Sequence, residues 1–404
     1  MGKINGEGCE MTNLRDRKRE AIPSVVLFLY SLSLAWPQYN AFVSIAAALA
    51  IVVIICFYRK EILVKLAAVP RLLYWAFGVF VCAVLVASLA IHDSASIAKA
   101  QNIIYWMLPF FLMYLLASFE KNKWLAAYYG FHLALLISNI IGLAEFIKTH
   151  GRVTGPYGHP NHFAMMLDIL LPYCLFMAVN YYRSKNNRLL ACGMLANSIW
   201  GVATLFLTAS RGAILGILLG AYFCLILYGF RKILWQKMAL IIVLLTCSLG
   251  YLGYNNMQNF HRSYDYERIL LMESSYNMWN DHKVFGVGLA NWEKEYQKKY
   301  ISPQAKEKEL DMPHNIIAYY FSTTGLIGGI GFCILMLGIM AYLIKNSLGL
   351  SLNVVFCYAM LLVAIAVTIH GLVDVGITMK SAARFFYGCL GLTVGVISCL
   401  DDKK

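Results

Sequence analysis

Arg211 is the residue whose position most strongly indicates chemistry. It lies in Thr208-Ala209-Ser210-Arg211-Gly212-Ala213, a very short joint between two long apolar stretches. A guanidinium group next to lipid is costly, so an arginine placed there indicates a functional site by default. The alternative is an interfacial arginine whose charged end reaches water while its stem packs against lipid. Ser210, its neighbour, is a candidate substrate contact.

His314 is the second candidate, in Met312-Pro313-His314-Asn315 directly before another apolar stretch. Proline suits the first turn of a helix, where its missing N–H is not needed. A histidine can accept a proton from a hydroxyl, or hydrogen-bond it, near neutral pH, so His314 is a candidate catalytic residue. Asn315 is a candidate substrate contact. The alternative for His314 is a structural place at the helix start.

Further basic and polar residues lie near the ends of other apolar stretches. Arg268 opens a predicted helix in a long hydrophilic segment, and Lys99 precedes the fourth apolar stretch. Arg152 and His159 lie in the turn-rich segment 151–162, which has two histidines and no carboxylate. A metal site there is only a weak alternative, because no acidic ligand is close.

Carboxylates are sparse at these ends, and no Asp-x-Asp metal pair is present; the main ones are Asp93, Glu145 and Asp374. We therefore predict no metal and no cofactor. Several arginines and a lysine instead suit a pyrophosphate, because guanidinium forks bond two phosphate oxygens and stabilise the charge of a departing group.

The elements that position these residues are membrane helices. The chain has 404 residues, of which 60% are hydrophobic and 14% charged, far from the composition of an ordinary soluble domain. The net charge of +13 sits in short clusters between apolar stretches, a pattern that indicates membrane topology rather than nucleic-acid binding. We predict an all-α polytopic protein with twelve transmembrane helices, at 21–36, 41–58, 71–91, 102–118, 124–147, 163–181, 189–208, 212–230, 238–254, 316–344, 352–371 and 383–400.

The basic residues also predict the orientation. Twenty of them fall in the N-terminal tail and the loops on one side, against six in the short loops on the other, and the richer side is cytoplasmic. Residues 1–20 are then a cytosolic tail, 21–254 hold helices 1–9, and 314–404 hold helices 10–12, with both termini cytoplasmic. The long loop 255–313 faces outward. Within it, the apolar pattern of Ile269, Leu270, Met272, Tyr276 and Trp279 predicts an amphipathic helix.

The order of the short motifs resembles that of a known family. Ser210-Arg211-Gly212-Ala213 is followed by a loop with Arg268 and Trp279, then Phe285-Gly286-Val287-Gly288, Pro313-His314-Asn315 and Thr324-Gly325-Leu326-Ile327-Gly328. This set, over roughly residues 200–345, resembles the O-antigen ligase and O-antigen polymerase superfamily of bacterial surface-polysaccharide enzymes.

The resemblance implies a metal-independent, inverting glycosyltransferase related in fold to the C class, in the bacterial inner membrane with a periplasmic site. The donor implied is an undecaprenyl-pyrophosphate-linked glycan. Transferred residue by residue, it assigns the donor pyrophosphate to Arg211 and Arg268, and the catalytic centre to His314. Lys99 matches, less closely, a basic residue that the ligases use near the same place.

The acceptor separates two alternatives within that superfamily. A ligase uses a sugar of the lipid A core, whereas a polymerase uses another lipid-linked repeat unit; the single long loop and the twelve-helix plan favour the ligase. A flippase or exporter of lipid-linked glycans is an alternative of another class, expected to carry charges inside the bundle along its route. Bond formation by the purified protein distinguishes an enzyme from a transporter.

Overall fold

The computed structural model describes residues 6–37, 39–119, 124–183, 187–232, 263–306, 308–349, 354–374 and 376–401, with a few isolated positions between 239 and 251. In this part of the chain the regular elements are helical, and no strand is present. The helices are α1 (Gly6–Ala35), α2 (Asn40–Tyr58), α3 (Ile62–Ala67), α4 (Arg71–Ala90), α5 (Ser94–Tyr105), α6 (Leu108–Ser118), α7 (Trp124–Thr149), α8 (Pro160–Arg183), α9 (Arg188–Leu207), α10 (Arg211–Lys232), α12 (Ser263–Asp281), α13 (Trp292–Glu295), α14 (Ile316–Ser347), α15 (Val354–Gly371) and α16 (Lys380–Asp401).

Ten helical segments of the described chain are long and apolar enough to cross a membrane, with α5 and α6 together forming one of them. The apolar part of α1, Ala21–Ala35, matches the first predicted span but is shorter. The predicted ninth span, 238–254, lies largely outside the described residues. The all-α polytopic membrane fold predicted from the sequence is confirmed.

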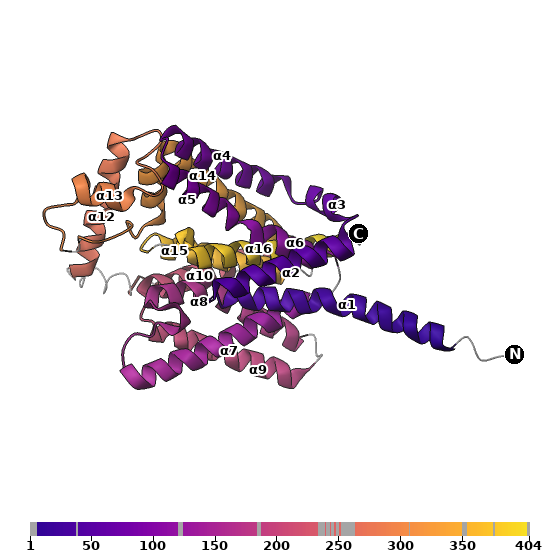
Figure 1. Cartoon of the computed structure of the whole chain (residues 1–404). Coiled ribbons are helices and arrows are strands. Elements are labelled where there is room, and N and C mark those ends of the chain that lie inside the picture. Colours follow the sequence, from indigo (N-terminus) through magenta and orange to yellow (C-terminus); the bar gives the residue numbers. More distant parts are fainter. Residues whose placement is uncertain are drawn as a thin grey trace.

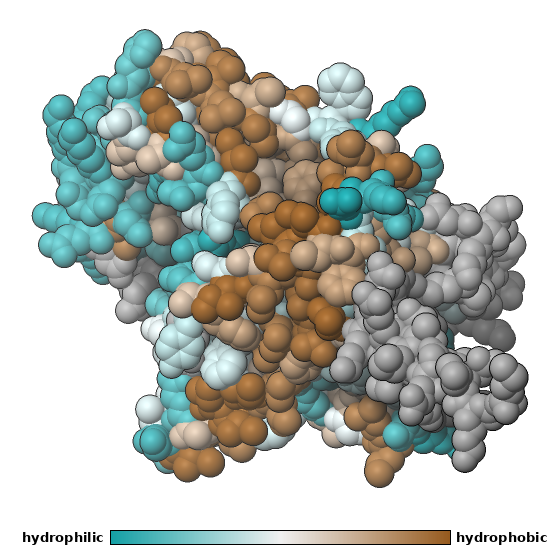
Figure 2. All heavy atoms as spheres, turned by 45° about the vertical axis from the view of Figure 1, so that its right-hand side comes forward, coloured by the Kyte–Doolittle hydropathy of each residue, from teal (hydrophilic) through white to brown (hydrophobic). Residues whose placement is uncertain are grey.

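The helices differ in how much of their surface the protein itself covers. In α16, 89% of the apolar window is buried, and in α8 and α15 78%, against 33% in α2, α9 and α10. The first three therefore form the centre of the bundle, and the others present apolar side chains outward, as lipid-facing helices do. Figure 2 shows this apolar surface in brown, and the broadest hydrophilic region in teal at the left-hand end.

That hydrophilic end, which we call the loop end, carries α12 and α13 (Figure 1). Trp292 of α13 is buried beneath α12 and donates a hydrogen bond from its indole N–H to the Ser275 hydroxyl, at 3.1 Å. The helix predicted in this loop is present as α12. Leu270, Leu271 and Met278 are buried, whereas Ile269, Met272 and Tyr276 are exposed.

Two glycines attach the loop to α14. Gly325 breaks the helix with φ +63° and ψ −160°, and Gly286 of the loop has φ +72°. The loop backbone bonds to α14 on both sides of this break, through Val287 N–H to the Ser322 carbonyl at 2.9 Å and Leu326 N–H to the Lys283 carbonyl at 2.8 Å. A Cβ atom on Gly286 would lie 2.3 Å from the Thr323 carbonyl carbon. Only glycine fits here, by conformation and by space.

Candidate active site

The loop end is where α8, α10, α14 and α16 begin and α15 ends, and it brings His314 next to Asp374. The histidine Nδ1 lies 3.4 Å from the Asp374 Oδ1, with 28% and 6% of the two side chains exposed. Because the carboxylate accepts from Nδ1–H, the other ring nitrogen, Nε2, is left as the acceptor for a proton. This is the arrangement that a general base needs.

Asn315 places this pair. Its side-chain oxygen caps α14 by accepting from Ala318 N–H at 2.9 Å, and its amide donates to the Leu372 carbonyl at 2.8 Å. The first bond fixes the start of α14, and the second ties it to the end of α15. His314 itself has φ +50°, a conformation that non-glycine residues seldom adopt. Asn315 is thus a positioning residue in the structure.

Arg152 belongs to a chain of hydrogen bonds that ends on the same carboxylate. Its guanidinium donates to the Thr208 carbonyl at 2.9 Å and to the Asn161 side-chain oxygen at 2.8 Å. Asn161 in turn donates through its amide to the second oxygen of Asp374. His159 lies beside this chain, and its Nδ1 accepts from Asn161 N–H at 3.3 Å. Arg152 and His159 therefore border the pair formed by His314 and Asp374.

A second Asp–His pair is buried behind the start of α10. His370 Nδ1 lies 2.7 Å from Asp168 Oδ2, with 1% and 0% of the side chains exposed. The other ring nitrogen lies 3.3 Å from the Ser210 hydroxyl. The approach is close because Gly212 has no side chain: a Cβ there would meet Val373 at 2.5 Å and His370 at 2.9 Å. The Ser-Arg-Gly motif is thus seated on α15, and Arg211 is exposed at the loop end.

A family model described as O-antigen ligase matches residues 196–333. We refer to these residues as the ligase domain. The predicted resemblance to the O-antigen ligase and O-antigen polymerase superfamily is confirmed over this part of the chain. A search of curated proteins gave no match.

The ligase domain holds Ser210, Arg211, Arg268, His314 and Asn315. Within it, Arg268 is half-buried in the second turn of α12, a helix that packs against α14 and so against the helix led by His314. An aromatic contact marks this packing, with the rings of Trp279 and Phe321 6.2 Å apart. Arg268 thus lies on a helix that packs against α14, and His314 lies just before the start of α14, so α14 connects the two residues.

Several site residues lie outside the ligase domain. Lys99 is inside α5 rather than ahead of a helix, and its ammonium lies 5.5 Å from the ring centre of Tyr319 in the first turn of α14. Asp93 caps α5 and also accepts from the Asn291 amide at 3.2 Å. The hydrogen bonds from Ser96 hold the pKa of Asp93 below its ordinary value. This carboxylate joins α5 to the loop that carries α12 and α13, which we call the ligase loop.

Sequence reasoning assigned no role to Asp374, Asn161, His370 or Asp168. Two of them carried a signal: Asp374 is one of the few carboxylates at a helix end, and Asp168 is an ionisable residue in the middle of a predicted span. Their partners could not be identified from spacing, since His314 and Asp374 are 60 residues apart and His370 and Asp168 are 202 apart.

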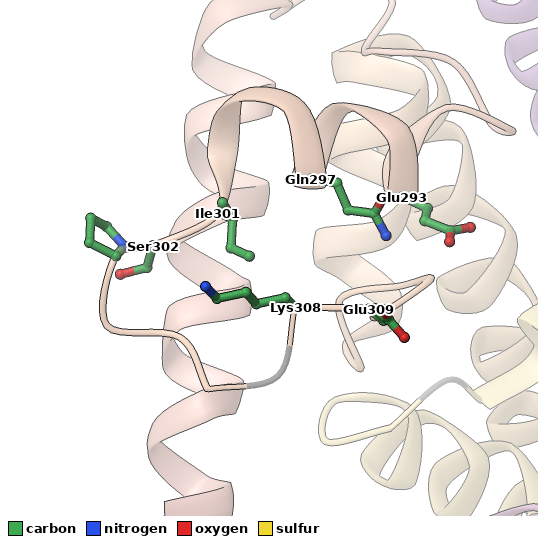
Figure 3. A pocket seen from close by; sticks show the side chains of 7 residues that line it. Glu293, Gln297, Ile301, Ser302, Lys308 and Glu309 are labelled. Atoms are coloured by element: carbon green, nitrogen blue, oxygen red, sulfur yellow. The ribbon is translucent and has the colours of Figure 1, made fainter.

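The ligase loop also holds an open cavity of about 720 Å³. Figure 3 shows its lining, which comes from α13, from the turn after it and from the segment around Lys308 and Glu309. None of the sequence-predicted site residues lines it. Among the described residues, no three His, Cys, Asp or Glu side chains group together as metal ligands do.

Proposed function

We propose that this protein is an O-antigen ligase that transfers a glycan from undecaprenyl pyrophosphate to a sugar hydroxyl of the lipid A core, at the periplasmic face of the inner membrane. The pair formed by His314 and Asp374 carries the proposal. Nε2 of His314 takes the proton as the acceptor oxygen attacks the anomeric carbon. The bond from that carbon to the pyrophosphate oxygen breaks, and its electron pair stays on the pyrophosphate of the departing lipid.

The carboxylate of Asp374 has two roles in this proposal. It fixes the histidine tautomer through Nδ1, and it stabilises the imidazolium that forms when the proton arrives. Asn161 holds its second oxygen, so Asp374 cannot turn away. Arg211 and Arg268 bind the donor pyrophosphate and offset the charge on the leaving group. The substrates also contact four residues around this centre: Ser210, Asn315, Arg152 and His159.

A lipopolysaccharide profile of a deletion strain tests the ligase reaction. Loss of all long chains, with lipid-linked polymer accumulating, is expected for a ligase. Survival of a core that bears a single repeat unit would instead identify the polymerase, the second candidate, which the motifs also fit. Formation of a glycosidic bond by the purified protein in detergent is required by both, and its absence would support a transporter.

The periplasmic placement is tested separately. Cysteines introduced beside Arg211, Arg268 and His314 are expected to react with a membrane-impermeant thiol reagent in cells whose outer membrane alone is permeable. Reaction only after lysis of the inner membrane would reverse the proposed orientation.

A further inference from the structure

Arg384 is a buried arginine in the second turn of α16 that the reaction above does not use. Only 8% of the residue is exposed. Its guanidinium carbon lies 5.1 Å from the ring centre of Tyr105 on α5, and Tyr30 of α1 is a second aromatic neighbour. In the described part of the chain, no carboxylate and no hydrogen-bond acceptor pairs with it. A buried charge without a counter-charge is costly.

The surroundings of Arg384 add positive charge. Lys380 lies four residues earlier on the same face of α16, is exposed, and is close enough for the two like charges to repel each other. Both residues lie in the first two turns of a 22-residue helix, whose N-terminus carries a partial positive charge. Two cations and a helix start at one place favour an anion, and phosphate is the anion that a guanidinium fork suits best.

The position of this group distinguishes it from the arginines proposed for the donor. α16 begins six residues after Asp374, and Arg384 packs toward α5 and α1. Ser210 and Gly212, which flank Arg211, lie instead against His370 of α15. The helices that hold Arg384 and those that seat Arg211 are therefore different, with Asp374 in the connection between α15 and α16.

We propose that Arg384 and Lys380 bind a phosphate group of the acceptor lipid. That this lipid is the acceptor rests on the proposed transferase function, whereas the phosphate site itself does not. A reaction between two membrane-anchored saccharides needs both held at the bilayer surface, and an anionic handle on the second lipid supplies this without contacting the reacting hydroxyl. Tyr105 provides an aromatic surface that keeps the guanidinium in place while it accepts a ligand.

Binding measurements on the full-length protein in nanodiscs of zwitterionic lipid test the site. The probes are lipid A with its phosphates, lipid A from which they have been removed, and a short-chain prenyl pyrophosphate. Arg384→Gln is expected to weaken binding of phosphorylated lipid A about tenfold or more, the scale of one charge-assisted hydrogen bond. Arg384→Lys should lose less, since it keeps the charge, and Lys380→Gln should weaken the same probe.

The matched control is Lys148→Gln, which removes one exposed charge from the loop end of α7 and should leave all three affinities unchanged. The proposal fails if Arg384→Gln weakens prenyl pyrophosphate instead, because the group then belongs to the donor position. It fails equally if the two forms of lipid A are affected alike, which indicates a structural role. A loss seen only when anionic phospholipid is added to the nanodisc would identify a bulk headgroup and also overturn it.

A measurement on the unmodified protein keeps the test valid if Arg384→Gln does not fold. Acylation of the Lys380 amine by an impermeant succinimidyl ester, read by mass spectrometry, should slow severalfold in the presence of phosphorylated lipid A, while Lys148 reacts at an unchanged rate. Equal rates at Lys380 with and without the lipid would contradict the proposal. Neither measurement needs turnover. Selective binding of phosphorylated lipid A by a protein that transfers no glycan would contradict the proposed reaction but still support the phosphate site.

Discussion

The molecule contains two Asp–His pairs of the same chemical type in different surroundings. His314 and Asp374 lie in the connections at the loop end, 3.4 Å apart, with 28% of the histidine side chain exposed. His370 and Asp168 lie inside the bundle, 2.7 Å apart and inaccessible to any substrate. The difference teaches that accessibility, rather than residue type, separates a pair suited to proton transfer from a pair suited to holding helices together.

The largest expected effect is on turnover at the accessible pair. His314→Ala should lower the rate of glycan transfer by about 10²-fold or more, because it removes general-base assistance, while the midpoint of thermal unfolding stays close to that of the unsubstituted protein. His282→Ala, at an exposed histidine beyond the end of α12, is the matched control. Near-normal turnover in His314→Ala would reduce this residue to a helix-start role.

The second effect, about tenfold or more on the rate, is expected for Arg211→Lys. Lysine keeps the charge but loses the planar fork that bonds two phosphate oxygens. Arg183→Lys, at the exposed end of α8, should leave the rate unchanged. If Arg211→Lys transfers glycan as fast as the unsubstituted protein, Arg211 serves only as an interfacial charge.

The third effect concerns stability and belongs to the buried pair. His370→Ala should destabilise the folded protein by about 2 kcal/mol, since it strands a carboxylate away from water, measured as a lower thermal midpoint in detergent. The double variant His370→Ala with Asp168→Ala should lose less than the two single losses added together. Strict additivity would show that the pair does not act as a unit.

The smallest effect is expected from chelation. If His314 and Asp374 move the proton and the arginines offset the pyrophosphate charge, as proposed, EDTA should leave the transfer rate of the purified protein unchanged. Complete loss of activity that magnesium or manganese restores would show that the reaction depends on a metal rather than on the accessible pair alone.

The helices of this fold could be predicted well from the sequence, because apolar length alone decides which segments cross a bilayer. The fourth span shows the limit. It was predicted from residue 102, whereas α5 begins at Ser94, because polar residues such as Ser96 and Lys99 hide the first turns of the helix from a hydropathy argument. Lys99 consequently lies on a helix, facing Tyr319.

The loop helix shows a different limit. Ile269 and Met272 belong to its apolar pattern, yet both are exposed, and two serines, Ser274 and Ser275, are buried. Amphipathic patterns predict burial when water is the only surrounding, and a helix that packs on a membrane protein has apolar surroundings on more than one side. The serines are buried because hydrogen bonds satisfy them.

The active-site candidates divide in the same way. His314 and Arg211 could be found because a charge or a histidine beside lipid is unusual in itself. Asp374 could not be assigned to His314, since their contact depends on how α14 is tied to α15 through Asn315. The partners of Arg152 also depend on tertiary packing, because its guanidinium bonds to Asn161 and to the Thr208 carbonyl.

The attachment of the loop to α14 at Gly286 and Gly325 has a mechanical consequence. Backbone hydrogen bonds on both sides of the break attach the loop to α14 at two points. A displacement of the loop would therefore be transmitted to α14, and so to His314 at its start, through the main chain as well as through side chains. We expect that replacing side chains along the attachment leaves these backbone hydrogen bonds intact. Inserting one residue between Lys283 and Gly288 should shift the register of the hydrogen bonds and move His314 relative to Arg268.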